Sequence, residues 1–171
     1  MNKKYFINWS IWIGVWSGVY VFLYVLSPLA QYGMLPATFV GLPIYFLSGA
    51  KKEEFLDFSL SAVGGVCWAL LYLFCIQAML DAGMSAAVSN GVVVGVLTIA
   101  LCAIHFILPP PFCTKIPMMF GAIAFTFITG AAQPVAVMIT FVLGICLAFL
   151  CNFGIKFLDE NGNWNFGAKK S

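Results

Sequence analysis

Few residues of this sequence could carry chemistry, and they are widely separated. His105 is the only histidine, and because imidazole changes its charge near neutral pH, it could form a pH-sensitive gate. The alternative is a histidine at the membrane interface that is satisfied by water or a loop carbonyl. The sequence shows no nucleophile with a base, no carboxylate pair suited to acid–base catalysis and no phosphate-binding glycine loop. We therefore expect that the protein is not an enzyme.

The six cysteines do not indicate a redox or metal centre. None of them lies in a loop expected on the outside of a cell, so no disulfide framework is implied. Cys67, Cys146 and the Met118-Met119 pair could offer soft ligands to Cu(I). No CxxC spacing occurs, however, and cysteine and methionine are ordinary apolar packing residues. We expect no metal and no cofactor, and because a basic patch is missing, no nucleic-acid partner.

The composition indicates an integral membrane protein. Of the 171 residues, 63% are hydrophobic and 8% are charged, whereas a soluble domain carries about 25% charged residues. Such a surface must face the lipid bilayer, where the backbone can pair only within helices or a closed barrel. The apolar runs are long and do not alternate, which argues against a barrel. The predicted fold is therefore all-α and polytopic.

Six apolar segments are separated by proline, glycine and charged residues that end one helix or begin the next. We expect transmembrane helices at residues 8–26, 36–50, 58–80, 86–108, 117–132 and 134–156. The first has about 19 apolar residues, more than the core of a signal peptide, so we expect it to be retained. The sequence thus predicts one transmembrane domain, 1–158, and a short cytoplasmic tail, 159–171, whose polar end should be mobile.

The lysines predict the orientation of these helices. There is no arginine, and the lysines are Lys3, Lys4, Lys51, Lys52, Lys115, Lys156, Lys169 and Lys170. With six spans, all eight fall on one side of the membrane, and the loops on the other side carry only Asp81. By the positive-inside rule, both termini should face the cytoplasm.

Small residues recur between the two halves of the chain. In the first and fourth segments, Gly14-Val15 and Gly18-Val19 correspond to Gly91-Val92 and Gly95-Val96. In the second and fifth, Pro36, Gly41 and Gly49-Ala50 correspond to Pro117, Gly121 and Gly130-Ala131. In the third and sixth, Gly65, Cys67 and Ala69 correspond to Gly144, Cys146 and Ala148. The alternative is chance similarity, because glycine and alanine are frequent in membrane helices. If the halves, 8–80 and 86–158, are repeats of three spans each, the second must be inverted relative to the first. We expect such an inverted 3+3 repeat.

Inverted repeats usually place a solute path where the halves meet, at a matched pair of short or interrupted helices. The second and fifth segments are the short ones, and Pro43 removes a backbone hydrogen bond inside the second. The candidate lining residues are Trp16, Gly41, Pro43, Trp68 and Gly121, with the two tryptophans facing each other across the path. The alternative is that the short helices and the tryptophans only pack.

No charged residue is expected deep inside a span, which argues against proton-coupled transport and against a strongly charged solute. We therefore expect a small channel or facilitator for an uncharged or weakly polar solute. Six short helices leave little room for a pore, so a homo-oligomer is expected. The GxxxG faces at Gly14 and Gly91 could pack either within one protomer or between protomers. The alternative is a non-transporting scaffold or regulatory subunit that binds a protein partner through residues 51–57, 109–116 and the tail.

Three stretches resemble a known family, and a fourth is similar to it. They are Gly14–Tyr20 (GVWSGVY), Phe39–Ala50 (FVGLPIYFLSGA) and Ser61–Ala69 (SAVGGVCWA), with Phe120–Phe127 (FGAIAFTF) in the second half. On these residues the chain resembles the DUF1097 family of small bacterial inner-membrane proteins, which has no established activity. The resemblance implies a bacterial inner membrane and supplies no catalytic residues.

Overall fold

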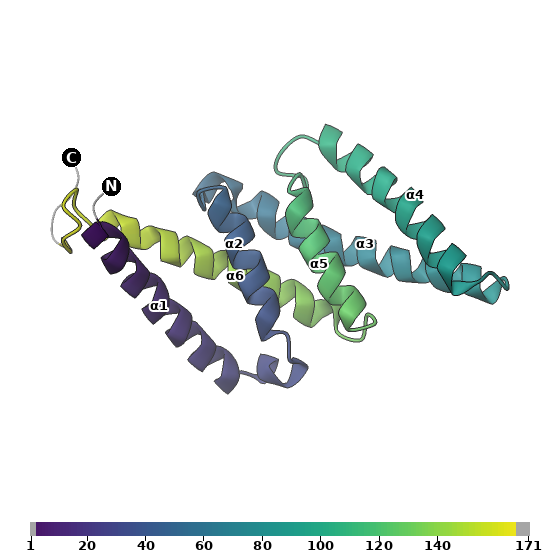
Figure 1. The fold of residues 1–171 in the computed structure, drawn as a ribbon, viewed down its shortest axis with the longest axis horizontal. Coiled ribbons are helices and arrows are strands. Elements are labelled where there is room, and N and C mark those ends of the chain that lie inside the picture. The colour runs from purple at the N-terminus through teal and green to yellow at the C-terminus, as the bar shows by residue number, and fades with distance from the viewer. Residues whose placement is uncertain (1–2, 167–171) are drawn as a thin grey trace.

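The computed structural model describes residues 3–166, and every regular element in that range is helical (Figure 1). The α-helices are α1 (Lys3–Leu26), α2 (Leu35–Leu47), α3 (Phe55–Asp81), α4 (Ala86–Ile107), α5 (Ile116–Ile128) and α6 (Pro134–Phe153). Short 3-10 helices are η1 (Pro28–Tyr32), η2 (Lys52–Glu54) and η3 (Gly154–Phe157). The prediction of an all-α protein is confirmed, and each predicted segment corresponds to one α-helix.

The helices differ in length. Four of them, α1, α3, α4 and α6, are long and apolar enough to cross a membrane. The other two, α2 and α5, have 13 residues each, or about 20 Å, which is shorter than a hydrocarbon core of about 30 Å. Both end earlier than the sequence predicted, because the chain turns out of the helix at Gly49 and Gly130, which have positive φ.

Each short helix packs on a long helix from the other half of the chain. In Figure 1, α2 and α5 lie at the centre of the bundle, and α1 and α4 lie at opposite ends. The main contacts are between α2 and α6 and between α3 and α5, and α3 also contacts α6. The end helices follow the same scheme, since α1 contacts α6 and α4 contacts α3.

Two glycines allow these short helices to approach the long ones. A Cβ atom on Gly65 of α3 would lie 2.4 Å from the carbonyl oxygen of Met119 in α5, and one on Gly144 of α6 would lie 2.5 Å from that of Thr38 in α2. At both crossings only a residue without a side chain fits against the facing backbone. Gly144 lies 79 positions after Gly65, and Met119 lies 81 positions after Thr38. The two crossings therefore use correspondingly placed residues.

The C-terminal ends of α2 and α5 also match. After α2, the Ala50 N–H donates to the Tyr45 carbonyl oxygen at 3.1 Å, and after α5, the Ala131 N–H donates to that of Thr126 at 3.0 Å. In each case the preceding glycine and the alanine have positive φ, and the hydrogen bonds are those of a Schellman motif. The two motifs are 81 positions apart.

The indoles of α1 satisfy free carbonyls at the end of α6. Trp12 Nε1 donates to the Leu150 oxygen at 3.0 Å, and Trp9 Nε1 donates to the Cys151 oxygen at 3.2 Å. The part of the tail that the structure describes, 159–166, lies against the start of α1, where Asn8 Nδ2 donates to the Gly162 oxygen at 2.7 Å. The mobility of the tail stays a prediction, and residues 167–171 lie outside the described residues.

The GxxxG faces of α1 and α4 do not mediate packing within the described chain. A Cβ atom added at Gly14, Gly18, Gly91 or Gly95 would meet nothing within 4 Å. These helices present most of their surface outward, since Tyr24 is the one buried residue of α1. The alternative of packing within the bundle is therefore wrong for these glycines.

The Gly144 crossing leads to a stability prediction. We expect Gly144→Ala to lower the free energy of unfolding by about 1–3 kcal/mol, because the new methyl group would overlap the Thr38 backbone. The control, Ser10→Ala on the exposed surface of α1, should change the free energy of unfolding by less than about 0.5 kcal/mol. Thermal unfolding of both variants in detergent measures the difference, and equal midpoints would contradict the crossing.

Candidate functional site

The two predicted seam glycines come together around one aromatic ring. A Cβ atom on Gly41 would lie 3.1 Å from the Phe141 oxygen, and one on Gly121 would lie 3.2 Å from its Cε1 atom and 3.3 Å from Val40 Cγ1. Phe141 of α6 is fully buried, and its ring packs edge-on against Phe125 at a centroid distance of 5.7 Å. The seam between α2 and α5 is thus filled by the Phe141 ring.

The other predicted lining residues lie away from this seam. Pro43 is exposed and lies inside α2, which continues through it, so the expected interruption of the helix is not found. Trp16 lines a groove of about 190 Å³ between α1 and α6. Trp68 lies on α3, and it contacts α4 at the opposite end of the bundle (Figure 1). The expectation that the two tryptophans face each other is wrong, because α1 and α4 are far apart.

His105 is held by Trp68. The Trp68 Nε1–H donates to His105 Nε2 at 2.9 Å, and the imidazole is only 9% exposed. Because Nε2 accepts this bond, it carries no proton, and the proton of the neutral ring must lie on Nδ1. That buried Nδ1 atom has no hydrogen-bond partner among the described residues. His105 is therefore a packed partner of Trp68 on α4, and its role as a gate stays a prediction.

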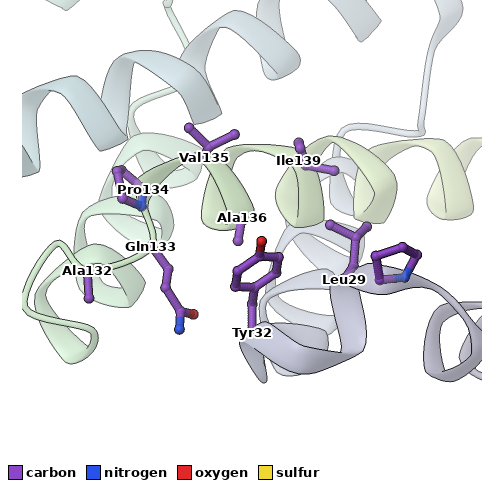
Figure 2. Close-up of a pocket in the computed structure, with 9 residues that line it drawn as sticks. Leu29, Tyr32, Ala132, Gln133, Pro134, Val135, Ala136 and Ile139 are labelled. Atoms are coloured by element: carbon purple, nitrogen blue, oxygen red, sulfur yellow. The ribbon is translucent and has the colours of Figure 1, made fainter.

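A cavity lies at the end of the bundle that carries no lysine. It has a volume of about 430 Å³ and opens between η1 and the start of α6 (Figure 2). Its lining is mostly apolar and consists of Pro28, Leu29, Tyr32, Ala132, Gln133, Pro134, Val135, Ala136 and Ile139. Volumes of about 300–1,000 Å³ with apolar walls and a few polar groups are typical of small-molecule sites.

The polar groups of this cavity lack partners. Oε1 of Gln133 is buried and forms no hydrogen bond within the described chain. Gln133 is also the residue before α6, and no side chain caps this helix end. The Val137 N–H bonds to the Gln133 carbonyl oxygen, but the N–H groups of Val135 and Ala136 precede the first full turn and have no partner within the helix. The cavity is therefore bordered by one buried acceptor without a partner and by the uncapped first turn of α6.

The opposite end of the bundle is closed by a polar cluster, which we call the lysine-side cluster: Glu54, Asp57, Ser61, Thr114 and Lys115. Asp57 is 2% exposed and accepts from the Thr114 N–H at 2.8 Å and from the Thr114 hydroxyl. Lys115 Nζ lies 3.0 Å from Glu54 Oε1 and 3.9 Å from Asp57 Oδ2. The Lys115 N–H also donates to Ser61 Oγ at 3.1 Å. The expected exposed loop at 51–57 is thus partly buried.

The cavity and the lysine-side cluster occupy corresponding places. Counting 79 positions forward from Glu54, Asp57 and Ser61 gives Gln133, Ala136 and Thr140. Counting 81 positions back from Pro109, Thr114 and Lys115 gives Pro28, Gly33 and Met34. Small or apolar residues thus replace Asp57, Thr114 and Lys115. Of the residues at the lysine-free end, Pro28, Gln133 and Ala136 line the cavity, whereas Met34 is buried in the core.

Sequence reasoning missed Gln133, Asp57 and Phe141. The 79-residue offset already seen between Gly65 and Gly144 also pairs Glu54 with Gln133. The sequence alone does not show, however, that Gln133 lacks a partner or that Asp57 contacts the loop at 109–115. Nothing in the sequence distinguishes Phe141 from the other 16 phenylalanines.

Six α-helices, four of them long and apolar, define a helical membrane protein. The chain belongs to the DUF1097 family, described as proteins of unknown function, whose model matches residues 10–156. No curated protein and no solved structure matches the chain. Within residues 3–166, no three histidine, cysteine, aspartate or glutamate side chains lie close enough to share a metal ion. Its function must therefore be argued from its own cavities and contacts.

The lysine-side cluster predicts the reactivity of Cys113. The Cys113 thiol contacts the Leu60 oxygen at 3.2 Å, and burial, followed by the charge of Asp57, raises its pKa. We expect Asp57→Asn to release Thr114 and to speed maleimide labelling of Cys113 in a chain whose other cysteines are replaced by serine or alanine. The exposed Asp81→Asn is the control, because Asp81 bonds only Gln77 on the same helix.

Loss of the Asp57 charge alone would also lower the pKa of Cys113 and so raise the thiolate fraction at a fixed pH. The labelling rate must therefore be measured across a pH series. Opening of the loop raises the rate on the alkaline plateau, whereas a change of pKa only moves the midpoint to lower pH. An unchanged plateau in Asp57→Asn would show that the cluster does not close this end.

Proposed function

We propose that the protein is a membrane facilitator that lets a small, uncharged or weakly polar solute pass down its gradient between two three-helix halves. The observation that carries this proposal is the difference between the two ends of the bundle. On the lysine side, contacts of Asp57 and Lys115 hold the α2–α3 and α4–α5 connections together, whereas a cavity of about 430 Å³ opens at the lysine-free end. A path that is open at one end and closed at the other is typical of alternating access between repeats.

The proposed halves, 8–80 and 86–158, form an inverted repeat. Its support is that the crossings at Gly65 and Gly144 use corresponding residues, as do the two Schellman motifs. In addition, half a turn of Figure 1 in its own plane exchanges the places of α1 and α4 and of α2 and α5. Three helices per half reverse the direction of the second half relative to the first.

The proposed path runs from the cavity along the seam between α2 and α5. Gly41 and Gly121 leave room there for a side chain, which Phe141 supplies in this state. A rotation of the Phe141 ring or a shift of α6 would be enough to admit a small solute. No charged residue lines the cavity, and a buried charge without a partner is costly. The solute is therefore uncharged.

We further propose that six spans place the chain in a bacterial inner membrane with both termini in the cytoplasm. The six described lysines support this orientation, because they lie at the start of α1, in the α2–α3 and α4–α5 connections and after α6. Such a bias of lysine toward one side follows the positive-inside rule. The cavity would then face the periplasm.

The proposed facilitator is a homo-oligomer. Its support is the open GxxxG faces of α1 and α4, which no part of the described chain covers. Without a hydrophobic driving force, membrane helices associate through close packing at small residues. A second copy of the chain provides a surface of the required kind.

Solute flux through the seam is testable at Phe141. We expect Phe141→Leu to raise the uptake of glycerol, urea and acetamide into proteoliposomes severalfold, because the smaller side chain leaves the seam partly open. Phe106→Leu on the exposed face of α4 is the matched control. Uptake equal to that of empty liposomes for every solute and both variants would contradict the transport proposal and favour a non-transporting scaffold or regulatory subunit.

Oligomer formation is testable at the glycine faces. The double variant Gly14→Leu/Gly18→Leu should shift the protein toward monomers in photobleaching step counts from lipid nanodiscs, because leucine keeps the partner helix away. Its helix content in circular dichroism should be unchanged, since these positions touch nothing in the described chain. Val15→Leu, on the exposed surface of α1, controls for added bulk. A wild-type chain that bleaches in one step would contradict the oligomer.

A further inference from the structure

We propose that the cavity between η1 and α6 is a binding site for a small neutral molecule that carries a primary amide or a hydroxyl group on an apolar body. This inference rests on the proposed function, because it names the chemical class of the solute and the place where it first binds. It follows from three properties of the cavity: its free acceptor, its free donors and the nature of its walls.

The free acceptor is Oε1 of Gln133. It is buried from solvent and has no partner in the described chain. Its counterpart at the other end of the bundle, Glu54, accepts from Lys115 Nζ at 3.0 Å. The residue that corresponds to Lys115 is Met34, which has no donor. The protein therefore does not supply the hydrogen bond that Gln133 needs, and a ligand with an N–H or O–H group can supply it.

The free donors are the backbone N–H groups of Val135 and Ala136 at the start of α6. Pro134 occupies the first position of this helix, and no side chain accepts from the first turn. At the corresponding place in α3, the Asp57 carboxylate bonds Thr114, whereas Ala136 has no polar side chain and lines the cavity. A carbonyl or hydroxyl oxygen is the matching ligand group, because the start of a helix carries partial positive charge.

The walls select a neutral ligand with an apolar body. Figure 2 shows Tyr32 and Leu29 of η1 on the side of α6 that carries Ala136, with the Gln133 amide beside Tyr32. No lysine, arginine, aspartate or glutamate is among the lining residues. A charged ligand would thus have no counter-ion inside the cavity. An amide supplies both the donor for Gln133 and the acceptor for the helix end, and its apolar part can pack against Leu29 and Ile139.

The test uses tritiated benzamide as the probe and the full chain in nanodiscs of pure phosphatidylcholine, whose head group has no hydrogen-bond donor. Binding to empty nanodiscs is subtracted to remove partition into lipid. We expect saturable binding that Gln133→Leu weakens about tenfold, the effect of one lost hydrogen bond. Gln77→Leu is the matched control, because Gln77 is exposed on α3 and bonds only Asp81, and it should bind as the wild type does.

A second variant separates loss of the binding site from loss of the fold in Gln133→Leu. Ile139→Trp fills the cavity from its wall without touching Gln133 and should abolish binding, while thermal unfolding shows whether each variant is folded. Binding that is not saturable, or that survives in a folded Gln133→Leu and in a folded Ile139→Trp, overturns the site.

The two proposals fail separately. If benzamide binds in a Gln133-dependent manner and Phe141→Leu does not change solute uptake, the site stands and the transport path falls. If uptake responds to Phe141 and binding is independent of Gln133, the path stands and this site falls.

Discussion

The arrangement of this protein depends on backbone-to-backbone contact at two glycines. Lipid is as apolar as the helix surfaces, so helices in a membrane gain no hydrophobic free energy by associating, and close packing must hold them together. Gly65 and Gly144 provide that packing, because each lets a short helix lie directly on a long helix of the other half. These crossings fix α2 and α5 side by side at the centre. They thereby determine where the seam between α2 and α5 lies and where the cavity opens.

Hydroxyl groups provide a second set of connections. Tyr20 and Thr38 are hydrogen-bonded at 2.6 Å and join α1 to α2, and Tyr72 and Thr98 are hydrogen-bonded at 2.9 Å and join α3 to α4. Each end helix is thus attached to the centre through a tyrosine and a threonine, although the two pairs do not occupy corresponding positions. Such bonds are worth about 1 kcal/mol each in a membrane. The end helices are held by a few directional contacts, whereas the centre is held by continuous packing.

The sequence was sufficient for the helices and insufficient for the site. Apolar runs and proline positions gave all six helices, since helix formation in lipid is decided locally by hydropathy and backbone hydrogen bonding. Gly41 and Gly121 were chosen because the second and fifth segments are short and correspond to each other, and the structure brings both glycines to the Phe141 ring; their role in lining a path stays a prediction. Pro43 was misplaced, since hydropathy does not reveal which face of an all-apolar helix points outward.

The same limit explains the missed polar residues. Asp57 was predicted only as part of the 51–57 segment that could bind a partner, and its burial follows from the contact with Thr114, 57 positions away. Gln133 attracts attention only when its partner is known to be missing, which requires the coordinates of both loops. Trp16 and Trp68 were paired on depth alone, whereas their positions depend on the separation of α1 and α4.

The chemical difference between the two ends bears on how the proposed path would work. Closing the lysine side buries Asp57 and leaves Lys115 Nζ half-buried at 3.9 Å from it, and the attraction between such charges is largely offset by the cost of desolvating them. Its closure therefore selects one geometry without adding much stability, so that the closed and open states can have similar free energies. The lysine-free end has no such pair, and Met34 and Ala136 could close it only through apolar contact. A neutral ligand that bonds Gln133 would then keep this end open until the ligand leaves the cavity.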